Sequence, residues 1–129
     1  MVGKCFYYDT PPKGSHPFVV LAPSAQEEGY FVCVNITEKR ELSDTACELV
    51  RGCHPALTKP VSIVNYAMAR SLPLSLIERL TKRHAIPDFT GALLCKIQTI
   101  GIAKDSQLPN KFKIAIEAYL LRSSSSPKR

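Results

Sequence analysis

Reactive side chains gather in one polar stretch of this sequence, between Asp44 and His54. Cys47, Cys53 and His54 carry groups that bind zinc when thiolates and imidazole rings surround one ion. The same residue types also make a thiol nucleophile and its base. However, the pairs of cysteines two residues apart that mark structural zinc are missing, and no local signature of a cysteine nucleophile is present. Both hypotheses stay open beside a third, in which these cysteines only pack in the interior.

The sequence contains none of the short motifs that identify large enzyme classes. There is no P-loop, no glycine fingerprint for dinucleotides, no nucleophile elbow and no helical pair of histidines for zinc. We therefore expect no cofactor and no bound metal.

Length and composition are typical of one soluble domain. With 129 residues, 45% of them hydrophobic, the chain can bury a core. No apolar run approaches the about eighteen residues that span a bilayer, and no secretory leader is visible, so we expect a cytoplasmic protein without a membrane partner. Five cysteines is an odd number, and Cys33 and Cys95 lie in apolar segments, which disfavours a disulfide framework.

Two apolar runs predict a β-hairpin. The first, residues 16–23, starts with His16 before a proline, which favours an extended backbone. The second, residues 29–37, is apolar at nearly every position, as in a strand covered on both faces. Because a short loop joins one end of each strand, His16 and Thr37 should meet at the other end. Asn35 shares a face with Thr37 and should point the same way.

The remaining pattern predicts more strands and then three helices. Residues 1–15 should form an irregular arm, whereas 45–50 and 61–68 can extend the sheet. After residue 73 the apolar period lengthens, with a capping-box sequence at 75–78. Helices are expected over residues 75–84, 88–101 and 109–122.

These elements predict an α+β fold in a single domain, residues 1–122. A small antiparallel barrel or strongly bent sheet should span residues 16–72, with the three helices covering one side of it. Residues 123–129, which are four serines, a proline and two basic residues, should be a disordered tail.

Positive charge is concentrated in the second half of the chain. Residues 1–64 carry six Lys/Arg and seven Asp/Glu, whereas residues 65–129 carry eleven and four, within a net charge of +6. A basic surface of this kind favours nucleic acid, because it neutralises phosphates and releases counterions. The alternative is that the charges only keep the protein soluble. The candidate RNA-binding residues lie on the first and third predicted helices: Arg79, Lys82, Arg83, Lys111 and Lys113.

The first hairpin resembles the opening of the MazF/PemK/Kid toxins. In that family a basic residue and a proline start a Val/Leu strand that ends in Ser/Thr-Pro, and here residues 16–23 read His-Pro-Phe-Val-Val-Leu-Ala-Pro. The family's next strand runs apolar into an end with Thr or Ser, as Tyr-Phe-Val-Cys-Val-Asn-Ile-Thr does over 30–37. The resemblance covers about a quarter of the chain.

Over most of its length the chain also resembles a group of small bacterial proteins of unassigned function. Those proteins carry Asn-x-Thr, Asp-x-x-Cys-x-Leu, Gly-x-His-Pro and a Val-x-Tyr strand. The matching segments here are residues 35–37, 44–49 (with an extra residue), 52–55 and 64–66.

The toxin resemblance implies a small SH3-like barrel, frequently dimeric, whose ribonuclease members cleave single-stranded RNA without a metal. The family's arginine falls on His16 and its Thr or Ser falls on Thr37. Arginine stabilises the charge of a phosphorane-like transition state, whereas a histidine can act as general base on the ribose 2′-hydroxyl or as general acid on the leaving oxygen. We name His16 and Thr37 as candidate catalytic residues and add His54, whose ring could instead cap a turn.

Three functions follow from these observations. The first is a toxin-like, RNA-directed protein of a bacterial toxin–antitoxin pair, which acts as a metal-independent endoribonuclease. Its partners would be single-stranded RNA and a cognate antitoxin, and a homodimer stays open. The second is a non-catalytic module that uses the same fold and its basic helices to dock nucleic acid or a protein, as gyrase-directed relatives of these toxins do. The third is a structural adaptor with no nucleic-acid role.

Overall fold

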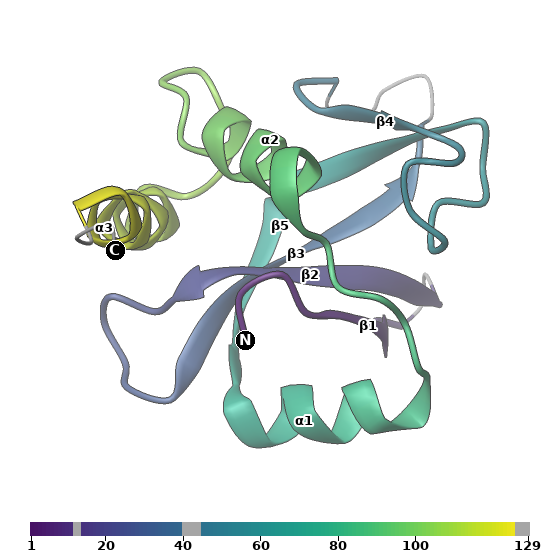
Figure 1. Ribbon diagram of the computed structural model, residues 1–129, viewed down its shortest axis with the longest axis horizontal. Coiled ribbons are helices and arrows are strands. Elements are labelled where there is room, and N and C mark those ends of the chain that lie inside the picture. The colour runs from purple at the N-terminus through teal and green to yellow at the C-terminus, as the bar shows by residue number, and fades with distance from the viewer. Residues whose placement is uncertain (12–13, 40–44, 126–129) are drawn as a thin grey trace.

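The computed structural model describes residues 1–11, 14–39 and 45–125, and within them the fold class is α+β, as predicted (Figure 1). An antiparallel five-stranded sheet precedes three helices. Among the described residues, no helix combines the length and the apolar composition needed to cross a bilayer. The elements in chain order are β1 (Cys5–Asp9), β2 (Ser15–Pro23), β3 (Tyr30–Glu38), β4 (Glu48–Val50), β5 (Val61–Pro73), α1 (Leu74–Arg83), α2 (Gly91–Gly101) and α3 (Asn110–Ser125).

The sheet has the strand order β1-β2-β3-β5-β4, so the predicted hairpin β2-β3 lies at its centre. The prediction of an irregular arm over residues 1–15 was wrong, because Cys5–Asp9 pairs with Ser15 to Val19 as an edge strand. The aromatic run Phe-Tyr-Tyr suits a pleated surface. The prolines that suggested irregular structure come after that strand, in the connection to β2.

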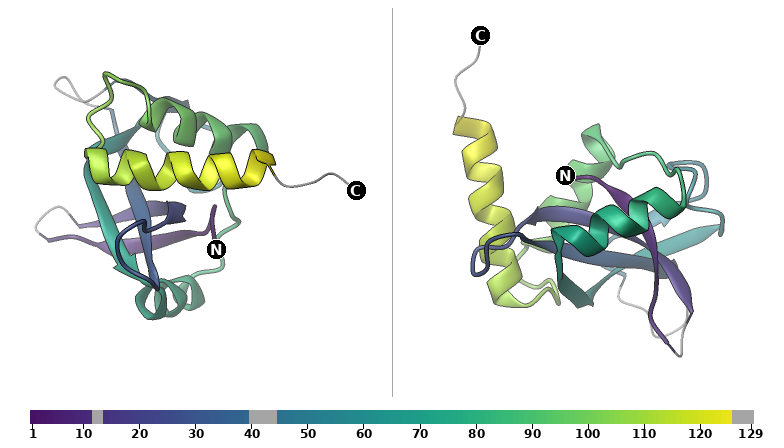
Figure 2. Two further views of the ribbon diagram at one scale, coloured as in Figure 1. Left: turned by 90° about the vertical axis from the view of Figure 1, so that its left-hand side faces the viewer. Right: turned by 90° about the horizontal axis from the view of Figure 1, so that it is seen from below.

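The sheet buries apolar side chains on both of its faces, which corrects the prediction that all three helices cover one side. Val19 and Leu21 of β2 pack in the core beneath α2 and α3, whereas Phe18 and Val20 pack with α1. Figures 1 and 2 show α1 on one side of the sheet and α2 and α3 on the other. Side chains alternate along a strand, so the apolar run of β2 requires a cover on each face.

Two of the helix ends differ from the predicted ones by more than one residue. The second helix begins at Gly91 and not at 88, because the amide of Phe89 donates to the Gly3 carbonyl at 2.7 Å and Thr90 has an extended backbone. The third helix continues to Ser125, over the first residues of the predicted tail, since serine is only moderately unfavourable in a helix. Residues 126–129 of that tail lie outside the described residues.

A hydrogen bond from α2 supports an irregular point in the central hairpin. The register of β2 against β3 shifts between Val20 and Ala22, and Leu21 lies within this bulge. The buried Gln98 donates from Nε2 to the Leu21 carbonyl at 2.9 Å. The bond ties α2 to the face of the sheet opposite α1.

Candidate functional site

A large pocket opens on the α1 face of the sheet, with a volume of about 950 Å³. Val34 and Ile36 belong to the core beneath α2 and α3, so Asn35 and Thr37, which alternate with them, project from the opposite face. Both of these polar residues line the pocket. The polar lining residues on which the following argument depends are His16, Asn35, Thr37, Lys59, Asn65 and Arg70.

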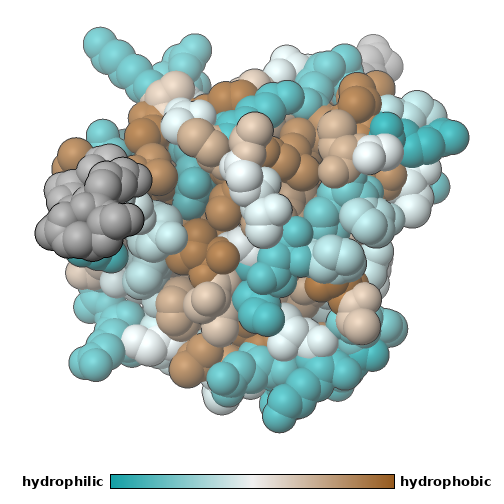
Figure 3. All heavy atoms as spheres, in the orientation of Figure 1, coloured by the Kyte–Doolittle hydropathy of each residue, from teal (hydrophilic) through white to brown (hydrophobic). Residues whose placement is uncertain are grey.

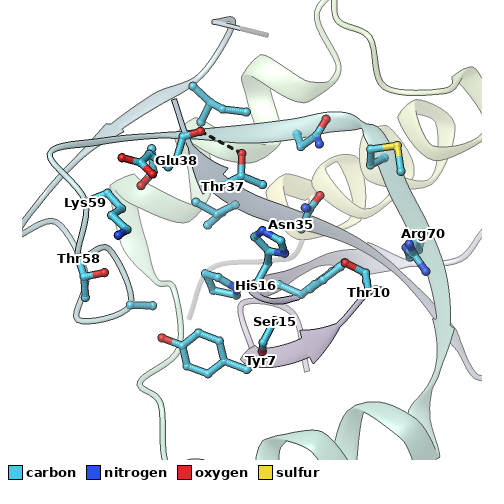
Figure 4. A pocket seen from close by; sticks show the side chains of 18 of the residues that line it. Tyr7, Thr10, Ser15, His16, Asn35, Thr37, Glu38, Thr58, Lys59 and Arg70 are labelled. Atoms are coloured by element: carbon cyan, nitrogen blue, oxygen red, sulfur yellow. Dashed lines mark hydrogen bonds between the residues drawn. The ribbon is translucent and has the colours of Figure 1, made fainter. Parts of the chain in front are cut away.

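His16 and Thr37 lie at the same end of the central hairpin, as predicted from the sequence. β2 and β3 pair Phe18 with Asn35, and this register continued toward the strand ends sets His16 opposite Thr37. Both side chains line the pocket (Figure 4). Because His16 lies on an inner strand, β1 supports it from the other side through the Tyr8–His16 pair.

The fold holds the polar groups of these two side chains only weakly. The Nδ1 atom of His16 is buried and has no hydrogen-bond partner among the described residues. The Thr37 hydroxyl donates to the Glu38 carbonyl over 3.4 Å, a long hydrogen bond (Figure 4). A substrate group that touches both residues would therefore displace at most one weak bond.

Asn35 and Asn65 form the next row of the pocket floor. Asn35 of β3 pairs with Phe18 on one side and with Asn65 of β5 on the other. The Asn35 side chain is buried, and its Oδ1 has no partner among the described residues. Its position beside Thr37 was predicted from the sequence, but a role for its amide was not.

Two cations of the pocket were not identified from the sequence. Lys59 comes from the loop between β4 and β5, and Arg70 comes from β5 (Figure 4). Strict alternation would put Asn65 and Arg70, five residues apart, on opposite faces. The register of β3 against β5 shifts between Cys33 and Asn35, and this irregularity brings Asn65 and Arg70 into the same pocket. No local sequence signal marks such a shift.

The charge of the pocket lining is moderately positive. Among the described residues that line it, Lys59 and Arg70 are permanent cations, and Glu38 contributes a carboxylate. Figure 4 shows Lys59 and Arg70 on opposite sides of His16. The Arg70 guanidinium also lies 6.0 Å from the centre of the Tyr8 ring, which fixes its direction. The two cations therefore flank the histidine.

The structure places His54 outside this pocket and gives both ring nitrogens a backbone partner. The Ala56 amide donates to Nδ1 at 3.0 Å, so Nε2 carries the proton and donates to the Pro87 carbonyl at 2.7 Å. The ring also stacks on Phe89, with centroids 4.0 Å apart. His54 thus joins the loop before β5 to the segment before α2, and we do not include it in the proposed active site.

We expect His54→Ala to lower the free energy of unfolding by about 2–4 kcal/mol, since it removes two hydrogen bonds and a buried aromatic stack. Thermal and denaturant unfolding would measure the decrease. His84→Ala is the matched control, because that ring is exposed at the end of α1. Equal stability of the two variants would contradict a structural role for His54.

The five cations predicted to bind RNA do not form one surface. Arg79, Lys82 and Arg83 are exposed on α1, on the face of the sheet that carries the pocket. Figure 3 shows hydrophilic side chains projecting at the lower edge, where α1 lies. Lys111 and Lys113 belong to α3, on the other face.

The two α3 lysines also interact with other parts of the fold. Lys113 donates to the carbonyls of Ala103 and Lys104 at 2.8 and 3.3 Å, and so closes the connection after α2. Lys111 lies over the ring of Phe112, 5.1 Å from its centre.

None of the five cysteines forms a disulfide among the described residues, and three of them are buried. Burial, with a smaller effect of the Asp88 charge, raises the pKa of Cys5 to about 12. Burial also raises the pKa of Cys33 well above its usual range. Both thiols therefore stay protonated at neutral pH and are poor nucleophiles.

The zinc and thiol hypotheses find no support in the arrangement of the polar stretch. Cys47 is buried, Cys53 is exposed, and both nitrogens of His54 are occupied by the backbone. Within the described residues, no group of three His, Cys, Asp or Glu side chains is placed to hold a metal ion.

The chain was compared with family models, with curated proteins and with solved structures, and no match was found in any of the three. What the protein does must therefore be inferred from the geometry of the pocket and from the resemblance of the first hairpin.

Proposed function

We propose that this protein is a toxin-like endoribonuclease that cleaves single-stranded RNA in the pocket of His16 and Thr37. One observation carries the proposal: the two residues that the hairpin resemblance singles out lie in the same pocket, and the buried Nδ1 of His16 has no partner among the described residues. An imidazole is a common general acid or base in catalysis, and one whose ring nitrogen makes no hydrogen bond within the fold is suited to act on a substrate.

In the proposed reaction, His16 removes the proton of a ribose 2′-hydroxyl. The 2′-oxygen then attacks the adjacent phosphorus, and the bond from phosphorus to the 5′-oxygen breaks. The leaving 5′-oxygen takes up a proton from the imidazolium, so the products are a 2′,3′-cyclic phosphate and a 5′-hydroxyl. Thr37 would donate its hydroxyl hydrogen to a non-bridging phosphate oxygen, in place of its long bond to the Glu38 carbonyl.

Lys59 and Arg70 would supply the positive charge that arginine supplies in the resembled family. They lie on either side of His16, where they can reach the phosphates that flank the cleaved bond (Figure 4). The pocket volume of about 950 Å³ is at the upper end of the range for ligand sites, about 300–1,000 Å³. That volume suits a segment of a strand better than a small ion.

The proposal also includes the finer fold and the biological setting. We propose that the bent sheet is an open relative of an SH3-like barrel, which the irregular pairing of β3 with β5 supports. A cytoplasmic location, a cognate antitoxin and a homodimer belong to the same proposal through the resemblance.

The second candidate function is a binding module without catalysis. It is favoured by the three exposed cations of α1, which share the pocket face of the sheet. On that hypothesis α1 would contribute most of the affinity for RNA and the pocket little.

We expect the double variant Lys59→Gln/Arg70→Gln to weaken RNA binding and to reduce the slope of its salt dependence by about 0.7 for each phosphate that is no longer neutralised. Filter binding of a single-stranded RNA over a salt series would measure both effects. The comparison variant is Lys111→Gln/Lys113→Gln, which removes the same charge from the other face, and thermal melting checks that losing the Lys113 bonds to Ala103 and Lys104 leaves the fold intact. The triple variant Arg79→Gln/Lys82→Gln/Arg83→Gln measures the contribution of α1.

Pocket and helix hypotheses differ in which variant binds RNA most weakly. The pocket hypothesis predicts the largest decrease in affinity for Lys59→Gln/Arg70→Gln and a small one for the α3 pair. A large decrease for the α1 triple variant, with none for the pocket pair, would favour the binding module. Equal decreases per charge removed would mean that binding depends only on net charge.

A further inference from the structure

Asn35 is a buried amide at a position where the fold alone would favour an apolar residue. The residue is 7% exposed, and its Oδ1 lacks a partner among the described residues. Its cross-strand neighbour on the same face, Phe18, is buried and apolar. An unpaired buried carbonyl oxygen lowers stability relative to an apolar side chain of the same shape. The stability of the ligand-free protein does not explain why this position carries an amide.

The unpaired Oδ1 belongs to a side chain that lines the pocket. Asn35 lines the pocket floor between Phe18 and Asn65, and Figure 4 shows its amide within the pocket that also holds the His16 ring. The row of His16 and Thr37 lies two residues away along the strands, which is about 6.5–7 Å. A nucleotide whose ribose lies at the His16 row can therefore place its base over Asn35.

We propose that Asn35 is the residue that selects the base next to the cleaved bond. Its Oδ1 accepts a hydrogen bond from an N–H on the edge of a nucleobase, and its Nδ2 donates to the neighbouring acceptor of the same base. This inference rests on the proposed function and deepens it, because it assigns a base-reading site to the pocket.

The chemistry of the amide favours a base over the other parts of a nucleotide. A phosphate offers only acceptors at neutral pH, so it cannot satisfy Oδ1, and the cations of the pocket belong to other residues, Lys59 and Arg70. The ribose hydroxyl is a single group and lies with His16 in the proposed reaction. A base edge carries a donor beside an acceptor, which is the pattern that an asparagine matches with two bonds.

The test uses Asn35→Leu, which keeps the size of the side chain and removes both polar atoms. We expect its melting temperature to equal or exceed that of the wild type, because the substitution replaces an unpaired buried oxygen with apolar atoms. Four RNA oligonucleotides that differ only in the base 5′ to a single cleavable bond give the second measurement. The wild type should prefer one base by about 10- to 100-fold, and the variant should cleave all four within about twofold of one another.

Two further variants define what the result means. Asn35→Ser keeps one polar group at this position without introducing a charge, so it should reduce the base preference without abolishing it. Gln26→Leu removes an exposed amide from the loop at the opposite end of the hairpin and should keep the wild-type preference. A preference that survives in Asn35→Leu, or a variant that unfolds, would overturn the proposal and make the amide structural.

The outcome for the wild type separates this inference from the proposed function. A wild type that cleaves all four oligonucleotides equally keeps the ribonuclease proposal and overturns the role of Asn35 alone. A wild type that neither binds nor cleaves RNA overturns both.

Discussion

His16→Ala should lower the rate of RNA cleavage by about 10²–10⁴-fold, the usual effect of removing a positioned acid or base. The melting temperature should change little, because the buried Nδ1 of His16 makes no hydrogen bond with the described residues. Single-turnover cleavage of a generic single-stranded RNA, with thermal melting of the same preparation, would measure both quantities.

Two variants make this result specific. His84→Ala removes an exposed ring at the end of α1 that does not itself line the pocket but meets the lining residue Tyr7 edge-on at 5.8 Å, and it should keep the rate within about threefold of the wild type. His16→Arg introduces the residue found in the resembled toxins, and it should remove the pH dependence that an imidazole gives to the rate. A His16→Ala variant as active as the wild type would assign the pocket to binding without catalysis.

Val34→Asp should abolish cooperative folding. Val34 is fully buried on β3, which pairs with β2 on one side and with β5 on the other. An unpaired charge there costs several kcal/mol, against a total stability of about 5–15 kcal/mol for a domain of this kind. The same result is expected for Val32→Asp, since Val32 is equally buried. Thermal melting followed by circular dichroism is the measurement.

The matched control for this charge is Val50→Asp. Val50 lies on the edge strand β4 and is 55% exposed, so an aspartate there stays in water and should shift the melting temperature by a few degrees at most. Similar melting temperatures for Val34→Asp and the wild type would show that β3 is not the centre of the fold.

The central hairpin could be predicted because its signals are local. Residues 16–23 and 29–37 are continuous apolar runs joined by a short loop, and β2 and β3 differ from these bounds by one residue at most. The same locality predicted that His16 and Thr37 end at the same edge. The bounds of the helices followed from their longer period to within three residues, but the face of the sheet that each helix covers did not.

The features that could not be predicted depend on pairing and packing between distant segments. β1 becomes a strand only because β2 offers it an edge, and α1 crosses to the second face only because Phe18 and Val20 require a cover. Arg70 enters the pocket through the irregular pairing of β3 with β5. No window of neighbouring residues contains this information.

The same contrast between local signals and distant packing applies to the residues of the candidate site. A short motif points to the pair at the end of the hairpin, whereas Lys59 lies in a loop and outside the charged helix faces that the sequence marks. The residue type of His54 suggests catalysis, but its contacts with Pro87 and Phe89, more than thirty residues away, show that the ring packs within the fold.

The chemical identity of the RNA ends tests the central claim most directly. Purified protein is incubated with a labelled single-stranded RNA in excess EDTA, and the products are identified by mass spectrometry. The mechanism of His16 predicts cleavage that leaves a 2′,3′-cyclic phosphate and a 5′-hydroxyl. Intact RNA, cleavage only after a divalent metal is added, or products with a 3′-hydroxyl and a 5′-phosphate would contradict it.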